Sequence, residues 1–435
     1  MPLLPSRGRL AEFRATGYYD HFPPKSMNVE IKSNDNGRKV LLVTKDIAAG
    51  ETIYKEYPVV AVLDADLEAS GKYCSHCFRL IDDSSTSTQL PADQNPLGST
   101  FCSDHCLTAN KAQSTSLLFT QEPPLPPELA ASNALDTAGR KEAQDKFVQY
   151  LKKEKRAGSL LVARFIARQV ALETAKLAGK VVSSTTGSTS SSTKTDEKRE
   201  DFTDAEEGDY LLADHIERLR YLSVKPNEEE LPLISAVLEK TLPGLEQFVT
   251  EERHSMLLGK MAYNAIGVGY RDDKPEPTAR PEDIEKARTP VGSQHQIGSA
   301  FYTLSSYANH SCTPSAKLSF PANTTELHII ATQNLKKGDE ITVAYVDVSQ
   351  HTESFETAAE ARRRRRIELA RGWRFACACP KCEEEGKELS KEEKKVEEGE
   401  IEVEDGKDES KVEESARKFE EKEKEMREEK GAEVE

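Results

Sequence analysis

Between residues 28 and 64, short runs of mainly apolar, often β-branched residues are separated by polar, turn-forming residues, which is typical of β-strands. Three stretches follow this pattern, at residues 29–31, 39–44 and 57–63. The turn-forming sequence Asn34-Asp35-Asn36-Gly37 separates the first two stretches, and Ala49-Gly50 lies before the third. The pattern therefore predicts three strands joined by turns.

Farther along the chain, apolar residues recur at helical spacing in two long segments. Residues 126–178 predict two or three amphipathic helices, and residues 203–260 continue the pattern. We interpret these helices as a support for a core formed elsewhere. Residues 181–201, mostly Ser and Thr, predict a flexible insertion, and the Pro- and charge-rich residues 271–292 predict a loop. The apolar positions on which the helices are predicted are Phe147, Tyr150, Leu151, Leu160, Leu161, Phe165, Ile166, Leu211, Leu212, Ile216, Leu219 and Leu222.

The chain has 435 residues, enough for two or three domains with a sizeable core. Its net charge is -16, but residues 383–435 hold 24 acidic and 12 basic residues, so residues 1–382 carry only -4. This negative charge disfavours binding to duplex DNA and favours binding to basic partners. No apolar run approaches the ~18 residues that span a membrane, and the N-terminus has no hydrophobic signal segment. We expect an intracellular protein of the nucleus, the cytoplasm or both, without membrane attachment or sequence-specific DNA binding.

Two charged segments leave alternatives open. Residues 386–435, mostly Glu and Lys, predict either a solvated single helix or disorder, and they either solubilise the chain or bind a basic protein surface. The five arginines at residues 362–366 are typical of nuclear-import and nucleic-acid-binding sequences. An exposed, solvated helix is the interpretation of this arginine run that we prefer.

The eight cysteines fall in two tight groups, which favours metal binding over disulfides in a large chain without a signal segment. Cys74 and Cys77 form one close pair, and Cys102 and Cys106 form another. Four thiolates at this spacing suit tetrahedral zinc, with residues 82–100 as a surface loop between the pairs. Buried or redox-active thiols are the alternative.

Three segments in the second half carry the most specific pattern. They are Asn309-His310-Ser311-Cys312, then Gly338-Asp339-Glu340-Ile341-Thr342-Val343-Ala344-Tyr345, and finally residues 372–382, which contain Cys377, Cys379 and Cys382. In residue identity, order and spacing these segments resemble the core of a SET-domain lysine methyltransferase. The resemblance implies an α+β chain built on a β-rich SET fold, in which the first two segments cross as a pseudoknot.

The resemblance also implies a site for S-adenosyl-L-methionine. Tyr345 stands where the family has its catalytic tyrosine, and Asn309 and His310 match the pair that binds the amino and adenine parts of the methyl donor. Asn264 resembles the family's upstream asparagine, Phe375 would stack on the adenine, and a glycine-containing turn of the first SET segment approaches the donor. The implied cofactor-binding residues are Gly37, Arg38, Lys39, Asn264, Asn309, His310, Tyr345 and Phe375.

The resemblance also implies which zinc site each group of cysteines forms. Cys312 is implied as the fourth ligand beside Cys377, Cys379 and Cys382 in a post-SET zinc site, which is structural because four sulfurs leave no position for water. Phe101-Cys102-Ser103 followed by Cys106 resembles a MYND zinc finger. No cysteine lies between residues 77 and 102, and no Cys or His lies in the thirty residues after Cys106, which leaves half a MYND finger with one zinc.

The order of these segments is that of the SET and MYND domain family over residues 28–385, most closely its fungal branch called SET domain-containing protein five. The implied organisation is an irregular N-terminal segment (1–27), a first SET segment (28–72), a MYND-like finger (73–110), a helical insertion (111–260), a SET core (261–350), a post-SET segment (351–385) and an acidic tail (386–435).

The predicted function is therefore methyl transfer from S-adenosyl-L-methionine to a lysine of a core histone tail, the fourth core histone being favoured by the resemblance. The amine must arrive neutral and in line, and Tyr345 would orient it. Two alternatives stay open: a lysine methyltransferase for a non-histone protein, and a non-catalytic SET-fold adaptor that binds chromatin. The sequence does not separate the first alternative from the histone interpretation.

Overall fold

A computed structural model describes residues 18–82, 87–123, 137–186, 211–241, 244–269, 296–352 and 356–387, with the side chains of residues 176–186 and 247 left out. The chain divides into two compact units. The first unit contains the chain up to Asn309 together with Pro314–Val343, and the second contains His310–Thr313 together with the chain from Ala344. The expectations for residues 1–17, 271–292 and the tail beyond residue 387 lie outside the described part.

The first two strands form a hairpin in the first unit. Strand β1 (Val29–Ser33) pairs antiparallel with β2 (Lys39–Val43), and both strands lie where the apolar runs and the turn between them predicted. Asn34 shapes the turn, because its side-chain oxygen accepts hydrogen bonds from the backbone of residues 36 and 38. Gly37 has a φ of 73°, a left-handed conformation that glycine adopts without strain.

Two three-stranded sheets complete the strand core of this unit. One has the order β10-β11-β3 and the other β4-β8-β7, with antiparallel pairing throughout. A β-carbon on Gly298 would lie 2.4 Å from the carbonyl oxygen of Val62, so β8 needs glycine there to approach β4. The bounds are β3 (Thr52–Glu56), β4 (Val60–Leu63), β7 (Ile266–Val268), β8 (Gly298–Phe301), β10 (Ala316–Ser319) and β11 (Leu327–Ala331), with the short strands β5 (Thr88–Gln89), β6 (Thr100–Phe101), β9 (Asn309–His310) and β12 (Thr342–Val343) elsewhere.

The predicted strand at residues 57–63 is shorter than expected. The structure places β3 at Thr52–Glu56 and begins β4 only at Val60. Pro58 lies between them, and proline has no N–H to donate to a strand ladder. The prediction therefore missed β3 and merged the start of β4 with the connection before it.

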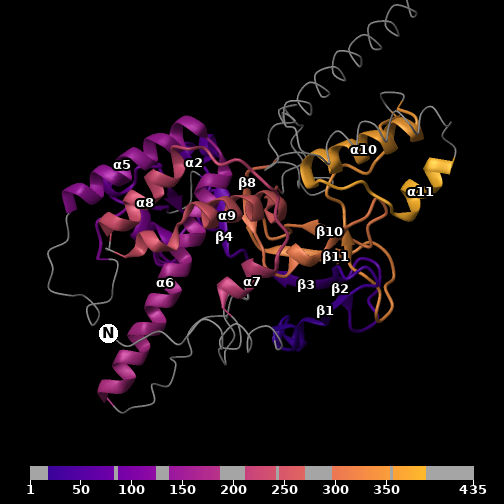
Figure 1. The fold of residues 1–435 in the computed structure, drawn as a ribbon, viewed down its shortest axis with the longest axis horizontal. Helices are drawn as coiled ribbons and strands as arrows, with labels where there is room; N and C mark the ends of the chain where they lie inside the picture. The colour runs from indigo at the N-terminus through magenta and orange to yellow at the C-terminus, as the bar shows by residue number, and fades with distance from the viewer. Residues whose placement is uncertain are drawn as a thin grey trace, which may run out of the picture. The chain divides into compact units, whose positions relative to one another are not determined.

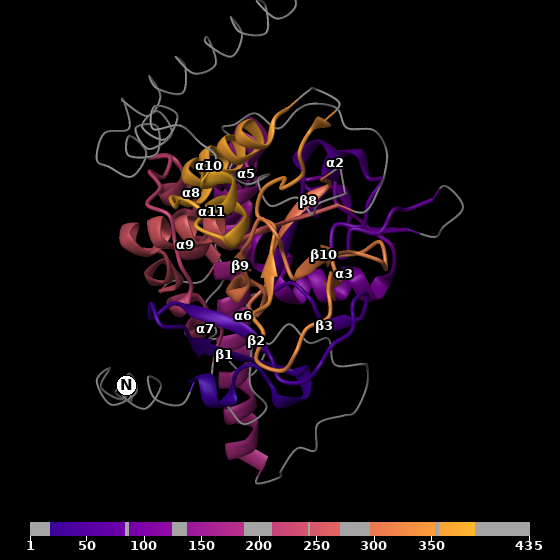
Figure 2. The same cartoon turned by 90° about the vertical axis from the view of Figure 1, so that its right-hand side faces the viewer.

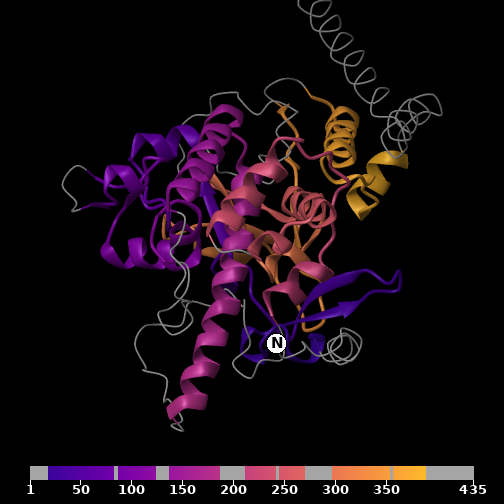
Figure 3. The same ribbon diagram turned by 60° about the vertical axis from the view of Figure 1, so that its left-hand side comes forward.

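Helix α6 (Ala157–Thr186) is the principal support of the first unit, and Figures 1 and 3 show it as the longest helix drawn. It packs against β4, β8 and α9, and residues 161–170 are all buried. Arg164 and Arg168 donate from this helix to the backbone carbonyls of Ala61 and Val59, which ties the helix to the strand edge. The predicted supporting role is thus confirmed. The helix also extends to Thr186, into the segment expected to be a flexible insertion, because residues 171–179 consist mainly of good helix formers.

The second helical segment is less continuous than the apolar pattern suggested. Helix α7 ends at Arg218, and Leu219 and Leu222 are buried in extended chain instead of on a helical face. Gly259 explains part of this arrangement, since a β-carbon there would lie 2.0 Å from the carbonyl oxygen of Leu222. The remaining helices of the unit are α2 (Ala65–Ser70), α3 (Asp104–Asn110), α4 (Ser116–Leu118), α5 (Thr137–Glu154), α7 (Leu212–Arg218), α8 (Glu230–Thr241) and α9 (Glu251–Asn264).

The second unit contains α10 (Ala358–Trp373) and α11 (Pro380–Lys387), which Figure 2 shows next to each other. Thr357 and Glu360 form a capping box at the start of α10. The arginine run at residues 362–366 lies in α10, but the expectation of a solvated helix was wrong for two of its members. Arg362 is 8% exposed and Arg365 is fully buried, because both side chains reach toward the cysteine-bearing end of the unit. None of the described helices is both long and apolar enough to cross a lipid bilayer.

A buried carboxyl group at the end of β3 gives the first unit a testable pH dependence. Glu56 accepts hydrogen bonds from Leu304 and Ser305, yet burial raises its pKa to about 7. Between about pH 4.5 and 7 the unfolded chain ionises at this residue while the folded chain keeps the proton, so stability decreases as pH rises through that window. The loss amounts to about 3 kcal/mol.

We expect Glu56→Gln to remove this contribution, because glutamine does not titrate. Urea unfolding at pH 5 and pH 7.5 checks it, with the exposed Glu51→Gln as a matched control. An unchanged pH dependence in Glu56→Gln would contradict the assignment of the buried proton to this residue.

Candidate active site and metal centres

Asn309 joins two distant segments of the first unit. Its side-chain amide donates to the backbone carbonyl of Lys39 at 3.2 Å and to the carboxylate of Glu340 at 2.9 Å. The segment with Glu340 is held against β2 by backbone hydrogen bonds between residues 338–341 and residues 41–43. The structure therefore brings Asn309 together with Lys39, as predicted for one site, and adds Glu340, which the sequence did not single out.

Asn264 is an anchored side chain with an unused acceptor. It lies at the C-terminal end of α9, is 1% exposed, and donates through its amide nitrogen to the carbonyls of Arg220 and Lys260, each at 2.8 Å. Its side-chain oxygen has no hydrogen-bond partner within the described structure. An orphaned buried acceptor costs about 1–3 kcal/mol, so this oxygen is well suited to receive a donor group from a ligand.

The turn at residues 37–39 contributes through its backbone. The Lys39 ammonium bonds to the hydroxyl of Ser33 and lies 4.2 Å from the ring centre of Tyr19, so only the carbonyl of Lys39 meets Asn309. A β-carbon on Gly37 would meet nothing within 4 Å. Gly37 is therefore required by the turn conformation rather than by a close neighbour, and no described contact joins it or Arg38 to Asn309 or Asn264.

In the second unit, His310 and Tyr345 are held together by a backbone-to-side-chain bond. The N–H of Tyr345 donates to Nδ1 of His310 at 3.1 Å, and Nε2 of His310 lies 3.3 Å from the sulfur of Cys312. Because Nδ1 accepts, the proton of the neutral imidazole is on Nε2, directed at this sulfur. The bond fixes the position of Tyr345 relative to His310.

Aromatic rings surround Tyr345, which is 4% exposed. The ring centre of Tyr345 lies 5.5 Å from that of His310, 5.3 Å from that of Trp373 and 6.4 Å from that of Phe375. His310 and Phe375 are also 6.2 Å apart. The structure thus gathers His310, Tyr345 and Phe375, all predicted site residues, and adds Trp373. The sequence analysis did not include Trp373 among the site residues. It could have been found, because it is the only tryptophan of the chain and lies two residues before Phe375.

Cys74, Cys77, Cys102 and Cys106, here called the finger cluster, lie in the first unit with their sulfurs within 4.8 Å of one another. The distance is 3.7 Å between Cys77 and Cys102 and 3.6 Å between Cys102 and Cys106. Tetrahedral zinc with Zn–S bonds of about 2.3 Å requires sulfurs about 3.8 Å apart. Hydrogen bonds from the neighbouring thiols lower the pKa of Cys106 to about 4. All eight cysteines are free, and this donor set fits zinc.

Cys312, Cys377, Cys379 and Cys382, here called the C-terminal cluster, gather in the second unit, again within 4.8 Å. Cys312 lies 3.9 Å from Cys377 and 3.5 Å from Cys382. Sulfur-to-sulfur hydrogen bonds lower the pKa of Cys379 and Cys382 and raise that of Cys377 and Cys312. Four convergent sulfurs without an oxygen or nitrogen donor fit a closed structural zinc site, with the fourth ligand that the resemblance implied.

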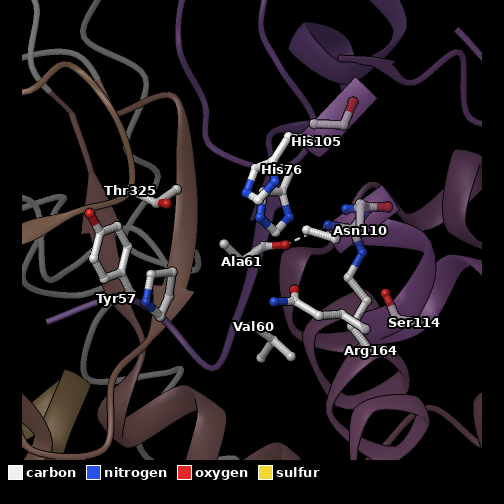
Figure 4. Close-up of a pocket in the computed structure, with 13 residues that line it drawn as sticks. Tyr57, Val60, Ala61, His76, His105, Asn110, Ser114, Arg164 and Thr325 are labelled. Carbon is white, nitrogen blue, oxygen red and sulfur yellow. Dashed lines mark hydrogen bonds between the residues drawn. The ribbon is translucent and has the colours of Figure 1, made fainter. Parts of the chain in front are cut away.

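A separate cavity of about 180 Å³, with both polar and apolar lining residues, lies in the first unit beside the finger cluster. Figure 4 shows Tyr57 and Thr325 on one wall and Asn110, Ser114 and Arg164 on the other. None of the predicted cofactor-binding residues lines this cavity. The buried Arg164 already donates to the carbonyl of Ala61, so the tie between α6 and β4 accounts for its position.

Comparison with known proteins places this chain in a family. The SET domain family matches residues 37–346, more than two thirds of the chain, a range that includes Lys39, Asn264, Asn309, His310 and Tyr345. The human protein-lysine N-trimethyltransferase SMYD5 is 40% identical over 85 residues, which is 20% of this chain and 19% of the human protein. The histone-lysine N-methyltransferase SET5 of Meyerozyma guilliermondii is 32% identical over 96 residues, 22% of this chain and 18% of the fungal protein.

The similarity thus spans only about a fifth of the length of these curated relatives. Among solved structures, the SET domain of LSMT bound to lysine and AdoHcy is 10% identical and overlaps 84% of this chain and 57% of its own, with a TM-score of 0.28. That score is too low for the two site geometries to be compared. Because the family match covers well over half of the residues, the chain belongs to the SET domain family.

Proposed function

We propose that the chain is an S-adenosyl-L-methionine-dependent protein-lysine N-methyltransferase. One observation carries the proposal. The family match includes Asn309, His310 and Tyr345, and each of these residues is fixed by hydrogen bonds: Asn309 to Lys39 and Glu340, and Tyr345 to His310. This arrangement supports a catalytic role for Tyr345 and donor-binding roles for Asn309 and His310.

The chain's residues support positioning more than acid–base chemistry. Bound S-adenosyl-L-methionine would supply a methyl group that is transferred in line to a neutral lysine amine. Tyr345 would orient that amine through its hydroxyl, while Trp373 and Phe375 exclude water beside it. Exclusion of water disfavours the charged ammonium and so lowers the lysine pKa. Correct positioning contributes up to roughly 7–11 kcal/mol to barrier reduction.

The side chain of Asn264 would bind the donor molecule. Its buried oxygen lacks a partner and its amide nitrogen is held by two carbonyls, so it presents a fixed acceptor to the amino group of the methionine part. His310 and Phe375 would contact the adenine part, and Asn309 would hold the turn at Lys39 in place. Zinc in the two cysteine clusters would act structurally.

For the substrate we propose a histone tail, in particular that of the fourth core histone. The charge of -16 favours a basic partner, and the Meyerozyma relative is named a histone-lysine N-methyltransferase. The tail would add as a strand beside the sheet, a common mode of peptide recognition. Action on histones would place the protein in the nucleus, the cytoplasm or both. A non-histone substrate is the second candidate, since the human relative is named for protein lysine without mention of histones.

The test is transfer of a labelled methyl group from S-adenosyl-L-methionine to each of the four core histones, alongside calorimetric titration of the chain with the donor. Label on the fourth core histone supports both parts of the proposal. Label on none of the histones, together with measurable donor binding, would favour the second candidate, an enzyme that methylates a non-histone protein. No label and no donor binding would overturn the methyltransferase proposal in favour of a binding adaptor.

Asn309→Ala should weaken donor binding at least tenfold. The substitution removes the bonds to Lys39 and Glu340, so the turn and residues 338–341 lose their common anchor. Charge-assisted and paired hydrogen bonds of this kind contribute about 1.5–3 kcal/mol. Calorimetric titration measures the effect, with Asn334→Ala as a matched control, because Asn334 accepts a bond from Ala49 in an exposed turn. Equal donor affinity in the two variants would contradict the assignment.

A further inference from the structure

Three of the five consecutive arginines of α10 face the C-terminal cluster. Arg362, through Nε, donates to the carbonyl of Cys382 at 2.8 Å, and Arg366, through Nη1, donates to the carbonyl of Cys377 at 2.6 Å. Arg365 pairs with the carboxylate of Glu385 in α11. Positions 362, 365 and 366 are three and four residues apart, so they share one face of the helix.

Arg364 points elsewhere and makes contacts of a different kind. It pairs with Glu356 at 2.8 Å and with Glu368 at 3.9 Å, and it donates to the carbonyl of Asp347. Its side chain is 23% exposed, whereas that of Arg365 is fully buried. The helical period therefore divides the arginine run into residues that contact the cysteine-bearing segment and a residue that does not.

The environment of Arg365 is unusual for a buried cation. Its Nε and Nη1 atoms have no hydrogen-bond partner within the described structure, although the side chain is completely buried. A buried charge normally requires both a counter-charge and full hydrogen bonding. The guanidinium interacts electrostatically with the sulfurs of Cys312 and Cys382 as well as with Glu385. The sulfurs are thus the neighbours able to satisfy its remaining donors.

The charge of the cluster depends on its metal. Four thiolates around Zn²⁺ carry a net charge of about -2, and thiolate sulfur accepts hydrogen bonds far better than a neutral thiol does. The same buried pocket thus holds two guanidinium nitrogens without a hydrogen-bond partner and, when metal is bound, a net charge of about -2. We propose that Arg365 is a positioning residue that neutralises and hydrogen-bonds the zinc-loaded C-terminal cluster, supported by Arg362 and Arg366 at its backbone carbonyls.

The packing around Arg362 agrees with this role. A β-carbon on Gly386 would lie 2.9 Å from Nη2 and 3.2 Å from Cζ of Arg362, so the absence of a side chain at this position lets the guanidinium lie against α11. Arg362, Arg365 and Arg366 thereby belong to the metal site of the second unit. The buried members of the arginine run are unavailable to an import receptor or to nucleic acid in the folded protein. The inference concerns zinc and does not depend on methyl transfer.

The test compares Arg365→Met with Arg364→Met in the full-length, zinc-loaded protein. Methionine keeps the length and apolar body of the side chain but removes its charge and donors. Zinc release to a chromogenic chelator should accelerate at least tenfold for one of the two zinc equivalents in Arg365→Met, because loss of an outer contact typically costs 10–100-fold in metal affinity. The second equivalent, from the finger cluster, should leave at the unchanged rate. Arg364→Met should release both as the parent does.

Two further measurements separate a charge effect from a packing defect. Arg365→Lys keeps the charge and should release zinc more slowly than Arg365→Met. In the cobalt-substituted protein, the thiolate-to-cobalt charge-transfer band should shift in Arg365→Met and stay in place in Arg364→Met. Equal zinc release by the Met and Lys variants, or an unshifted cobalt band, would overturn the proposal. If Arg365→Met does not fold, Arg365→Gln takes its place, because glutamine removes the charge and keeps a polar side chain. A parental zinc-release rate together with a parental cobalt band in Arg365→Gln would overturn the proposal.

Discussion

Tyr345→Phe should reduce methyl transfer by about 10²–10³-fold while leaving donor binding and zinc content unchanged. The ring would stay in place, because it is 4% exposed and packs beside Trp373, Phe375 and His310. Only the hydroxyl that would orient the lysine amine is removed, and loss of one pre-positioned polar group at a reacting centre has effects of this size. The measurement is single-turnover transfer of a labelled methyl group at saturating donor.

A matched substitution distinguishes this effect from general damage. Tyr57→Phe also removes one hydroxyl, which donates to Glu326 at 2.6 Å in the first unit and has no assigned part in the chemistry. It should retain nearly full activity. Full activity in Tyr345→Phe would refute the assignment of Tyr345, and loss of activity accompanied by loss of donor binding would mean that the hydroxyl helps to hold the donor instead of orienting the amine.

Local patterns predicted local structure well. The apolar runs at residues 29–31 and 39–44 and the turn between them predicted the β1–β2 hairpin, since adjacent strands joined by a tight turn need no information from distant parts of the chain. The paired cysteines of the finger cluster were grouped correctly for the same reason: a short knuckle brings two thiols together by itself. Pro58 was visible in the sequence, but its interruption of the predicted strand was overlooked.

Contacts between distant segments were beyond local patterns. Cys312 lies 65 residues before Cys377, and only the family resemblance joined it to the C-terminal cluster. The bond from Asn309 to Glu340 and the unpaired oxygen of Asn264 were likewise invisible, because they depend on where the chain returns in space. The arginine run illustrates the same limit. Its helical period was readable, but which face would be buried depended on the position of α11.

The positions of the predicted site residues limit the roles that these residues can perform. The structure gathers His310, Tyr345 and Phe375 in the second unit and joins Asn309 to Lys39 in the first. Position restricts the chemistry that each side chain can perform, and it does so most sharply for Tyr345, whose backbone is tied to His310.

Cys312→Ser should remove one of two zinc ions and unfold the end of the second unit. Serine is protonated at neutral pH and replaces a thiolate poorly, so the C-terminal cluster would keep three sulfurs where tetrahedral zinc requires four ligands. Structural zinc contributes about 10–16 kcal/mol in small zinc-binding peptides, far more than the helix α11, eight residues long, gains from its own propensity. Amide hydrogen exchange should therefore lose protection across α11.

The finger cluster provides the reciprocal control for this substitution. Cys74→Ser should also reduce the metal content from two zinc ions to one, but the loss should leave the amide protection of α11 intact, since Cys74 belongs to the first unit. Atomic absorption counts the ions, and exchange read by mass spectrometry locates the change. Two retained zinc ions in Cys312→Ser would rule out Cys312 as a ligand. One ion with α11 still protected would mean that Arg362 and the packing against α10 hold this end of the chain without metal.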